Sequence, residues 1–257
     1  MAVEKKSGEK VRPVLTGNTL LGKDLIKIIK GKTIVDHVTL SVSSGEVVGL
    51  LGPNGAGKTT SFNMMIGLIR NNGGEVYFNN QPIGGLAMHE RARMGIGYLP
   101  QEPSVFRRLT VEENILAVLE ATDRGNTETR KKFAYSMMKE FGVEHKQHAL
   151  GVTLSGGERR RVEIARAVSL EPAFILLDEP FAGIDPLSVK DIQRVIRLLQ
   201  KRGIGVLITD HNVRETLGIC NRAYILTDGK VLIGGTPDEI LADKRARSAY
   251  LGHDFNL

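Results

Sequence analysis

The sequence is poor in cysteine and has no long apolar run. Among its 257 residues Cys220 is the only cysteine, so no disulfide can form within the chain, which fits a reducing compartment. We expect this thiol to behave as a small buried side chain. A run of about eighteen apolar residues, which a membrane-spanning helix needs, is absent. The first ten residues lack an apolar centre, so we expect no signal peptide, and a role at a membrane would need a partner.

A large excess of charge of one sign is also absent, with 35 lysines and arginines against 29 aspartates and glutamates. The formal net charge is +6 and the charged share is 25%, which permits binding to nucleotide, nucleic acid or lipid headgroups but indicates none of them alone. With 41% hydrophobic residues, the chain has enough apolar side chains for the core of one large α/β domain. We predict a flexible N-terminal tail at residues 1–17, where the sequence is polar and without periodicity, and a single domain at residues 18–257.

Residues 52–59, Gly-Pro-Asn-Gly-Ala-Gly-Lys-Thr, match the phosphate-loop pattern G-x-x-x-x-G-K-[ST] at every fixed position. The apolar residues 47–51 predict a buried strand before this loop, and helical spacing predicts a helix after it. Glycines let backbone N–H groups turn inward, and the helix start adds its positive end. Lys58 would then reach the terminal phosphates, and the Thr59 hydroxyl would ligate Mg²⁺. Kinases, switch GTPases and transport ATPases share this loop, so it does not identify the reaction.

The remaining pattern alternates strands with helices. Between residues 110 and 142 only helices are predicted, and the first begins at a capping box over residues 110–113. Helices without strands between them cannot extend a parallel sheet, so we place a helical lobe at about residues 102–170. A second capping box, at residues 236–239, opens the last helix. Strands are predicted at residues 75–78, 96–99, 174–177 and 206–208, with two or three short strands between residues 20 and 43 and a hairpin about Asp228-Gly229.

Acidic and polar residues follow three of these strands, at the edge where open α/β sheets bind ligands. Asp178 is placed to hold Mg²⁺, and Glu179 to orient and polarise an attacking water molecule. The alternative for this pair is a helix cap. Gln101 could touch both the Mg²⁺ and that water, and His211 could bond the γ-phosphate, although a solvated amide and a capping histidine would give the same pattern.

A second anion site is predicted at residues 154–158, Leu-Ser-Gly-Gly-Glu, which open a long helix. One nucleotide cannot easily use both helix starts of a compact chain, so two chains would sandwich two nucleotides in an isologous dimer. The arginines at positions 159–161 follow at once and oppose the helix dipole. They form a solvated basic face or, as we hypothesise, at least one of them strengthens the field for phosphate or pairs with an acid.

In their order along the chain these motifs closely resemble an ATP-binding-cassette (ABC) ATPase subunit, over residues 19–257. The resemblance implies an α/β P-loop NTPase fold with a RecA-like core, an antiparallel β subdomain and an inserted helical lobe. It also implies ATP and Mg²⁺ as cofactors and a homodimer that closes on ATP and couples hydrolysis to a partner. The motifs that carry it are the phosphate loop, Gln101, residues 154–158, 174–179 and 182–185, and His211.

The family pattern implies a role for each matching residue. Glu179 is the catalytic base, His211 the γ-phosphate switch and Asp185 a dimer contact. The implied ATP-binding residues are Gly52, Pro53, Asn54, Gly55, Ala56, Gly57, Lys58, Thr59, Thr60, Asp178 and Ile29. The implied signature residues, which face the ATP of the opposite subunit, are Ser155, Gly156, Gly157 and Glu158, and the implied Mg²⁺ ligands are Thr59, Gln101 and Asp178.

Six segments are similar to one subgroup, the ABC ATPases that power lipopolysaccharide export. This similarity implies a homodimer on the cytoplasmic face of a Gram-negative inner membrane, two membrane permease subunits as partners, and no nucleic acid. Phe106 and Arg107 are our candidates for the groove that receives the permeases, with packing inside the lobe an equal alternative. The six segments are residues 97–102, 106–109, 154–167, 178–186, 209–217 and 250–255.

Two other functions stay open. ATPases of branched-chain amino-acid importers have a similar C-terminal ending, although the continuous Arg-Arg-Arg helix and the short lobe favour export. Soluble ABC proteins that act on ribosomes or DNA usually carry two cassettes or a long coiled-coil insertion, and this chain has one cassette and room for neither. Glu158, where the wider family commonly has Gln, agrees with the export subgroup.

Ile29 occupies the position at which the family pattern has an aromatic residue that stacks on adenine. Aliphatic packing replaces part of that contact but not the π-stacking. We therefore predict weak discrimination between bases, with ATP and GTP turned over at comparable rates. Steady-state turnover with each nucleotide measures this, and a strong preference for ATP would contradict it.

Overall fold

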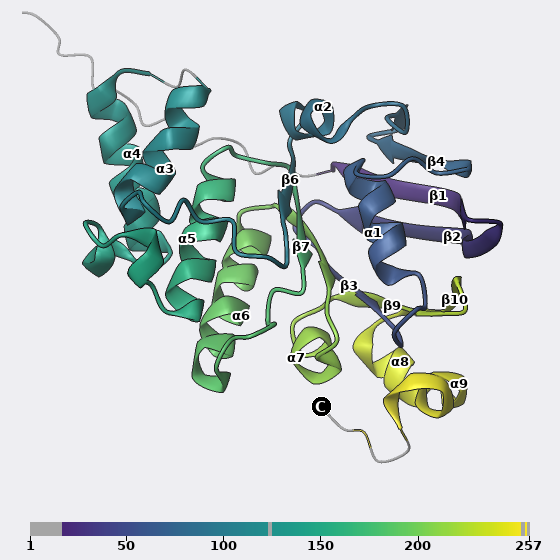
Figure 1. The fold of residues 1–257 in the computed structure, drawn as a ribbon. Coiled ribbons are helices and arrows are strands. Elements are labelled where there is room, and N and C mark those ends of the chain that lie inside the picture. The colour runs from purple at the N-terminus through teal and green to yellow at the C-terminus, as the bar shows by residue number, and fades with distance from the viewer. Residues whose placement is uncertain (1–16, 123–124, 253–254, 256–257) are drawn as a thin grey trace, which may run out of the picture.

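The larger of two β-sheets carries the core, as the computed structural model shows for the residues it describes, 17–122, 125–252 and 255 (Figure 1). Its strand order is β10-β9-β3-β8-β7-β6, parallel except for the antiparallel edge strand β10. Strands β3 and β8 are buried along their whole length, as their continuous apolar sequences predict. The bounds are β3 Val47–Leu51, β6 Ile96–Leu99, β7 Phe174–Asp178, β8 Gly205–Thr209, β9 Arg222–Thr227 and β10 Lys230–Gly235.

The second sheet is antiparallel, with strand order β2-β1-β4-β5. The prediction of two or three short strands in residues 20–43 was right to allow two strands but wrong about their length, because the structure has two strands of 11 and 12 residues. Their register shifts around Leu25, and Asp24 has a positive φ of 56°. Such bulges break the alternation of apolar and polar residues, so one long strand has the sequence pattern of two short ones. The bounds are β1 Thr19–Ile29, β2 Lys32–Ser43, β4 Gly73–Phe78 and β5 Gln81–Pro82.

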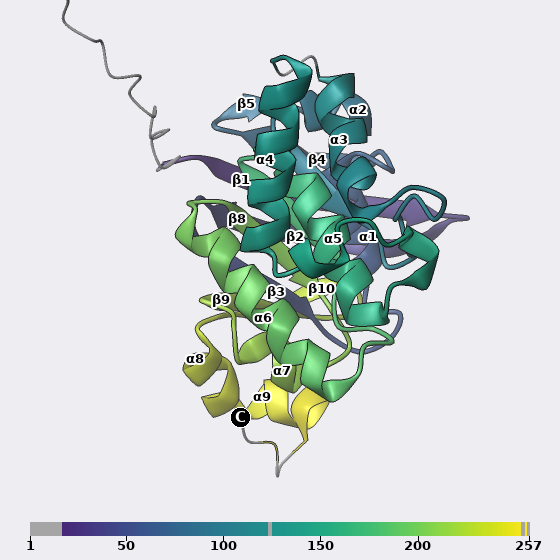
Figure 2. The same ribbon diagram turned by 90° about the vertical axis from the view of Figure 1, so that its left-hand side faces the viewer.

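Helix α1, Lys58–Ile66, packs between the two sheets (Figure 1). Its buried residues, among them Phe62 and Met65, share one apolar cluster with Leu40 of β2 and Leu176 of β7. The opposite face of the large sheet is covered by helices α3 to α6, as the turned view of Figure 2 also shows. The fold is therefore layered: small sheet, α1, large sheet and an outer helical layer, which confirms the predicted fold class.

The helices begin where the capping boxes predict. The hydroxyl groups of Thr110 and Thr236 each accept from the backbone N–H three residues on, and the corresponding glutamates bond back. Three of the helices fall within the predicted lobe at residues 102–170, whose exact boundaries stay a prediction. The bounds are α2 Met88–Arg93, α3 Val111–Ala121, α4 Thr127–Glu140, α5 Gly156–Val168, α6 Pro186–Lys201, α7 Val213–Leu217, α8 Pro237–Ala242 and α9 Lys244–Ala246, with the short turns η1 Glu144–Lys146, η2 Gly151–Thr153 and η3 Arg247–Leu251.

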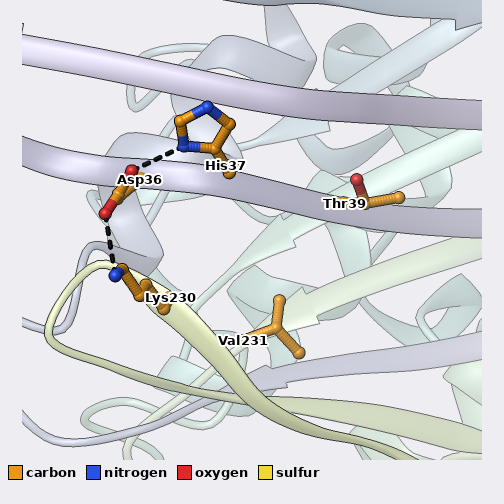
Figure 3. Close-up of a pocket in the computed structure, with 5 residues that line it drawn as sticks. All are labelled: Asp36, His37, Thr39, Lys230 and Val231. Carbon is orange, nitrogen blue, oxygen red and sulfur yellow. Dashed lines mark hydrogen bonds and ion pairs between the residues drawn. The ribbon is translucent and has the colours of Figure 1, made fainter.

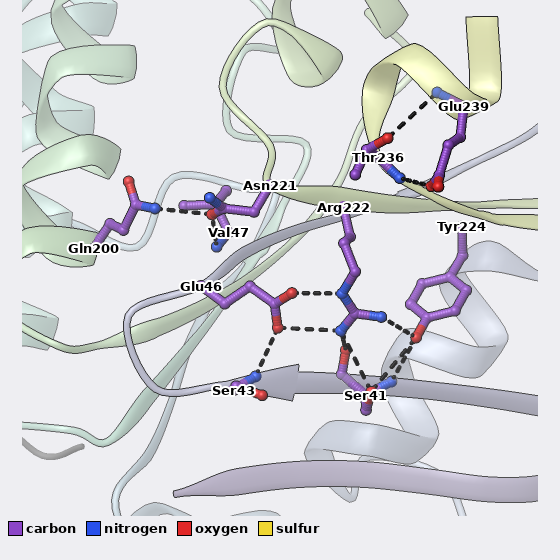
Figure 4. Close-up of polar contacts among 10 residues, drawn as sticks. All are labelled: Ser41, Ser43, Glu46, Val47, Gln200, Asn221, Arg222, Tyr224, Thr236 and Glu239. Atoms are coloured by element: carbon purple, nitrogen blue, oxygen red, sulfur yellow. Dashed lines mark hydrogen bonds and ion pairs between the residues drawn. The ribbon is translucent and has the colours of Figure 1, made fainter. Parts of the chain in front are cut away.

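Two arginines join the layers. Arg222 of β9 donates to the Glu46 carboxylate, to the Tyr224 hydroxyl at 2.9 Å and to the Ser41 carbonyl at 3.1 Å, which ties the large sheet to β2 (Figure 4). Arg91 is only 2% exposed, and its guanidinium donates to four carbonyl groups. Two of these carbonyls lie in the last turn of α1, where the helix leaves them without a partner and where a cation is favourable. The four acceptors of Arg91 are the carbonyls of Met64, Met65, Gly84 and Leu86.

Three sequence expectations concern segments outside the site. Cys220 is partly buried against the core, and burial raises the pKa of its thiol, as expected for a small packed side chain. The predicted tail at residues 1–17 lies outside the described residues except for Gly17. Within the described part of the chain, none of the helices has the length and apolarity that crossing a membrane requires.

Candidate functional site

The phosphate loop connects β3 to α1, as predicted. A Cβ atom on Gly52 would lie 2.2 Å from the Leu226 carbonyl oxygen, and one on Gly57 would lie 2.8 Å from the Ile34 carbonyl oxygen. Both residues also have positive φ angles, of 142° and 93°, so glycine is needed at each. Ala56 is buried beneath the loop, whereas Asn54, Gly55 and Thr59 are exposed along it.

Lys58 is folded back on its own loop. Its ammonium group donates to the carbonyl oxygens of Gly52 at 2.6 Å and Pro53 at 2.9 Å. Partial burial lowers the pKa of Lys58, and the negative charge of Glu179 opposes that shift. An ammonium group held only by two neutral carbonyls is available to a more strongly charged acceptor.

The three residues predicted to be catalytic lie together at the carboxyl ends of the strands. The Gln101 side-chain amide donates to Oε2 of Glu179 at 2.8 Å, and Nδ1 of His211 lies 3.4 Å from the same oxygen. Glu179 has a φ of 44°, which is uncommon for a residue with a side chain, and its backbone N–H donates to the Thr209 carbonyl at 2.7 Å. The backbone therefore holds the Glu179 carboxylate at the meeting point of the ends of β6, β7 and β8.

Two further carboxylates crowd the same edge. Burial raises the pKa of Asp178 to about 6, with the charges of Glu179 and Asp210 adding to the rise and Arg160 opposing it. Asp210 was not predicted from the sequence. It is fully buried, burial raises its pKa, and it accepts from the backbone N–H groups of Phe181 and Asn212. It thus positions the segment after Glu179 and the turn that carries His211.

Arg160 is the second functional residue that the sequence did not single out. The hypothesis that an arginine of residues 159–161 pairs with an acid is confirmed twice, by Arg160 with Glu163 at 3.3 Å and by Arg161 with Asp191 at 3.1 Å. Arg160 is buried and also donates to the backbone carbonyls of Pro100 and Asp178, at the ends of β6 and β7. The run of arginines was visible in the sequence, but the inward direction of Arg160 was not.

The signature residues form the start of α5. The Ser155 hydroxyl accepts from the Glu158 N–H at 3.3 Å, and the Glu158 carboxylate accepts from the Ser155 N–H at 2.9 Å. A Cβ atom on Gly157 would lie 2.6 Å from the Ser188 hydroxyl, so glycine lets α6 approach. Asp185 caps α6. Among the described residues, no hydrogen bond or ion pair joins residues 155–158 to the phosphate loop.

The remaining predicted residues lie on the surface. Ile29 is 42% exposed at the end of β1. Phe106 is 45% exposed, with the Arg166 guanidinium 4.6 Å from the centre of its ring, and the Arg107 carbonyl accepts from the Val152 N–H. Phe106 therefore combines packing against the lobe with an exposed face, and its role in a permease groove stays a prediction.

A shallow hollow of about 390 Å³ lies between β2 and β10 and is lined by Asp36, His37, Thr39, Lys230 and Val231 (Figure 3). Hydrogen bonds from His37 and then Lys230 hold the pKa of Asp36 below its usual range. The hollow contains none of the predicted catalytic residues. It is connected to the phosphate loop by backbone bonds, because Gly229 accepts from the Asp36 N–H and donates to the Ala56 carbonyl.

Comparison with known sequences identifies the family. The profile described as ABC transporter matches residues 35–182, and one described as branched-chain amino acid ATP-binding cassette transporter matches residues 234–256. The chain is 55% identical to the lipopolysaccharide export system ATP-binding protein LptB of Escherichia coli K12, over 93% of this chain and 99% of that protein. It is 57% identical to the protein of the same name from Acidithiobacillus ferridurans, over 93% and 98% of the two chains. A probable ABC transporter ATP-binding protein of Azorhizobium caulinodans is 51% identical, over 97% and 89%.

Solved structures agree with this result. An ATP-binding cassette of an ABC transporter in its ADP conformation superposes with a TM-score of 0.82 at 27% identity, over 93% of this chain and all of that chain. A dimeric post-hydrolysis cassette bound to ADP and Pi gives a TM-score of 0.74 at 28% identity, over 85% and 98%. This chain belongs to the ABC transporter family, as one of its ATP-binding subunits.

Proposed function

We propose that this chain is the ATP-hydrolysing subunit of an ABC transporter that powers the extraction of lipopolysaccharide from the inner membrane toward the outer membrane. The hydrolase part rests on one observation, the convergence of Gln101, Glu179 and His211 at a sheet edge that also carries Asp178. The cargo rests on relatives that are 53–57% identical and carry the lipopolysaccharide export name.

ATP would bind along the phosphate loop, with the backbone N–H groups around the start of α1 directed to its phosphates. Lys58 would exchange the carbonyls of Gly52 and Pro53 for phosphate oxygens, because a charged acceptor forms the stronger bond. Ile29 would contact the base by aliphatic packing. The other loop residues would contribute through their backbone, and Thr60 through its place in the first turn of α1.

The residues present fit Mg²⁺. A carboxylate, a hydroxyl and an amide oxygen, from Asp178, Thr59 and Gln101, are hard oxygen donors of the kind this ion takes beside nucleotide phosphates and water. No cluster of three or more His, Cys, Asp or Glu side chains suited to a metal occurs in the described ranges, so the ion would enter with the nucleotide. Bound there, Mg²⁺ supplies charge neutralisation for the phosphates. Burial raises the pKa of Asp178 to about 6, and a cation held there would favour its ionised form.

Glu179 would orient the attacking water and accept its proton as the bond between the γ-phosphorus and the leaving ADP oxygen breaks. Its Oε2 atom is engaged by Gln101 and His211, so nucleotide binding must redirect those two side chains. His211 would turn to the γ-phosphate, and Gln101 to the metal and the water. The resting arrangement therefore keeps the base occupied until the substrate competes for its partners.

A second copy of the chain would complete each site. ABC ATPase cassettes form dimers and work with membrane permease subunits, and one solved relative is itself dimeric. Ser155, Gly156, Gly157 and Glu158 would face the nucleotide held by the other chain, with Asp185 at the contact between chains. Two permease subunits would place this dimer on the cytoplasmic face of the inner membrane, with Phe106 and Arg107 in the groove. We expect no nucleic acid partner.

The importer alternative keeps one observation in its favour, the branched-chain amino acid profile over residues 234–256. That match spans only the C-terminal end, whereas the export relatives match 93% of this chain. Export is therefore the better-supported cargo class.

The test uses Glu179→Gln, which should bind ATP and hydrolyse it at least about 100-fold more slowly, because the amide cannot accept the proton. Purified from detergent-solubilised cells with ATP, this variant should carry two multi-spanning permeases with a periplasmic domain, identified by mass spectrometry. The same purification without ATP is the control. Co-purification of importer-type permeases would indicate amino-acid uptake instead of export. Co-purification of ribosomal proteins without membrane partners would contradict a transport function.

Asp178 gives a pH-dependent prediction. Its folded pKa of about 6 exceeds the ordinary 3.8, so the folded protein holds this proton more tightly than the unfolded chain and loses stability as pH rises through that window. Asp178→Asn removes the free-energy cost of ionising this buried carboxyl. Without nucleotide, the free energy of unfolding of the variant relative to the wild type should therefore rise by about 1–3 kcal/mol as the pH goes from 4 to 7. The variant should also lose Mg²⁺-dependent ATP turnover.

Chemical denaturation at both pH values measures the difference. Asp243→Asn is a control of opposite sign, because hydrogen bonds from Arg245 and from backbone N–H groups keep the pKa of Asp243 low. The ionised Asp243 carboxylate stabilises the fold at neutral pH, and this effect fades as the pH falls. The Asp243→Asn variant should therefore be less stable than the wild type at pH 7. An Asp178→Asn variant that is less stable than the wild type at pH 7 would contradict the prediction.

A further inference from the structure

The signature segment contains an acid where its proposed task calls for positive potential. Glu158 lies in the first turn of α5 and accepts from the Ser155 N–H, which is one of the backbone groups that a helix start offers to an anion. The side chain of Glu158 is only 16% exposed, so water screens its charge poorly. An ionised carboxylate here accepts a hydrogen bond from the helix start that would otherwise be open to an anion, and it repels a phosphate that approaches from a second chain.

Two basic side chains of the neighbouring turn η1 face this carboxylate, and one of them is the lysine Lys146. Nζ of Lys146 lies 3.4 Å from Oε1 of Glu158, and Nε2 of His145 lies 3.7 Å from the same oxygen. The other oxygen, Oε2, is the one that accepts from Ser155. Burial raises the pKa of Glu158, but hydrogen bonds from Ser155 and Lys146 outweigh burial and hold this pKa below its usual range, so the carboxylate is ionised.

The turn that presents Lys146 is fixed by the backbone. The Lys146 N–H donates to the Val143 carbonyl, and the Lys146 carbonyl accepts from the Ala149 N–H. The next residues are joined to the start of α3, where the Val111 N–H donates to the Ala149 carbonyl and the Glu112 N–H to the Gln147 carbonyl. Lys146 is therefore attached to a rigid turn within reach of the signature acid, and 39% of its side chain is exposed.

We propose that Lys146 neutralises the Glu158 carboxylate and so preserves the positive potential with which the start of α5 receives the nucleotide of a second chain. Lys146 is a positioning residue, because it acts on phosphate only through Glu158. This inference rests on the proposed function, in which the signature segment closes on the ATP of the partner copy. A neutral glutamine at position 158 would need no such cation.

The experiment measures ATP turnover of the purified full chain against ATP concentration. Lys146→Gln should raise the ATP concentration for half-maximal rate about two- to fivefold, because it leaves the signature carboxylate uncompensated. The effect should shrink at high ionic strength, where charges are screened. Lys146→Arg keeps the charge and should restore the wild-type value. Lys132→Gln is the matched control, because Lys132 forms a similar ion pair with Glu128 on α4 and does not contact the signature segment.

The deciding comparison is made in the Glu158→Gln background. There the Lys146→Gln substitution should have no further effect, since no carboxylate is left to neutralise. An equal loss in both backgrounds would show a structural role for Lys146 and overturn the proposal, as would an unchanged ATP dependence of Lys146→Gln alone. A wild-type chain without ATP turnover would instead remove the proposed function, and this inference with it.

Discussion

Three carboxylates meet at one edge of the large sheet, and their mutual repulsion is the constraint on which the site depends. Asp178 is the last residue of β7, Glu179 follows it, and Asp210 follows the neighbouring strand β8. Burial raises the pKa of Asp178 and of Asp210, because little water is left to screen their charges. Arg160, placed among the carbonyls of the same strand ends, supplies the permanent cation that makes this arrangement tolerable.

This constraint explains why the resting site is arranged as it is. The Glu179 carboxylate is shared between the Gln101 amide and the His211 ring, and the Lys58 ammonium is held by carbonyls of its own loop. These four groups, which are proposed to act on ATP, thus each have a partner within the protein. In the proposed function, a metal ion and a polyphosphate would replace these partners with stronger ones, so nucleotide binding would itself rearrange the site.

Much of this could be predicted from the sequence, because short-range patterns determine it. A buried strand, a glycine loop and a helix are contiguous in the sequence, so residues 52–59 could be recognised as the phosphate loop. Asp178 and Glu179 follow the apolar residues 174–177, whose pattern predicts an interior strand. The features that the sequence did not predict depend on tertiary contacts. The bulge near Asp24 interrupts the alternation of apolar residues in β1, so the predicted strand was too short, and neither the inward turn of Arg160 nor the anchoring bonds of Asp210 has a local signal. The lysine beside Glu158 comes from a different turn and could not be paired with it by spacing.

The central claim is that one chain holds two half-sites that become complete only against a second copy. Light scattering of the purified Glu179→Gln variant tests it directly, with and without ATP and Mg²⁺. We expect the mass of one chain without nucleotide and twice that mass with ATP, because the signature segment of each copy would close on the nucleotide of the other. A mass of one chain at saturating ATP, with nucleotide binding confirmed in the same sample, would contradict it.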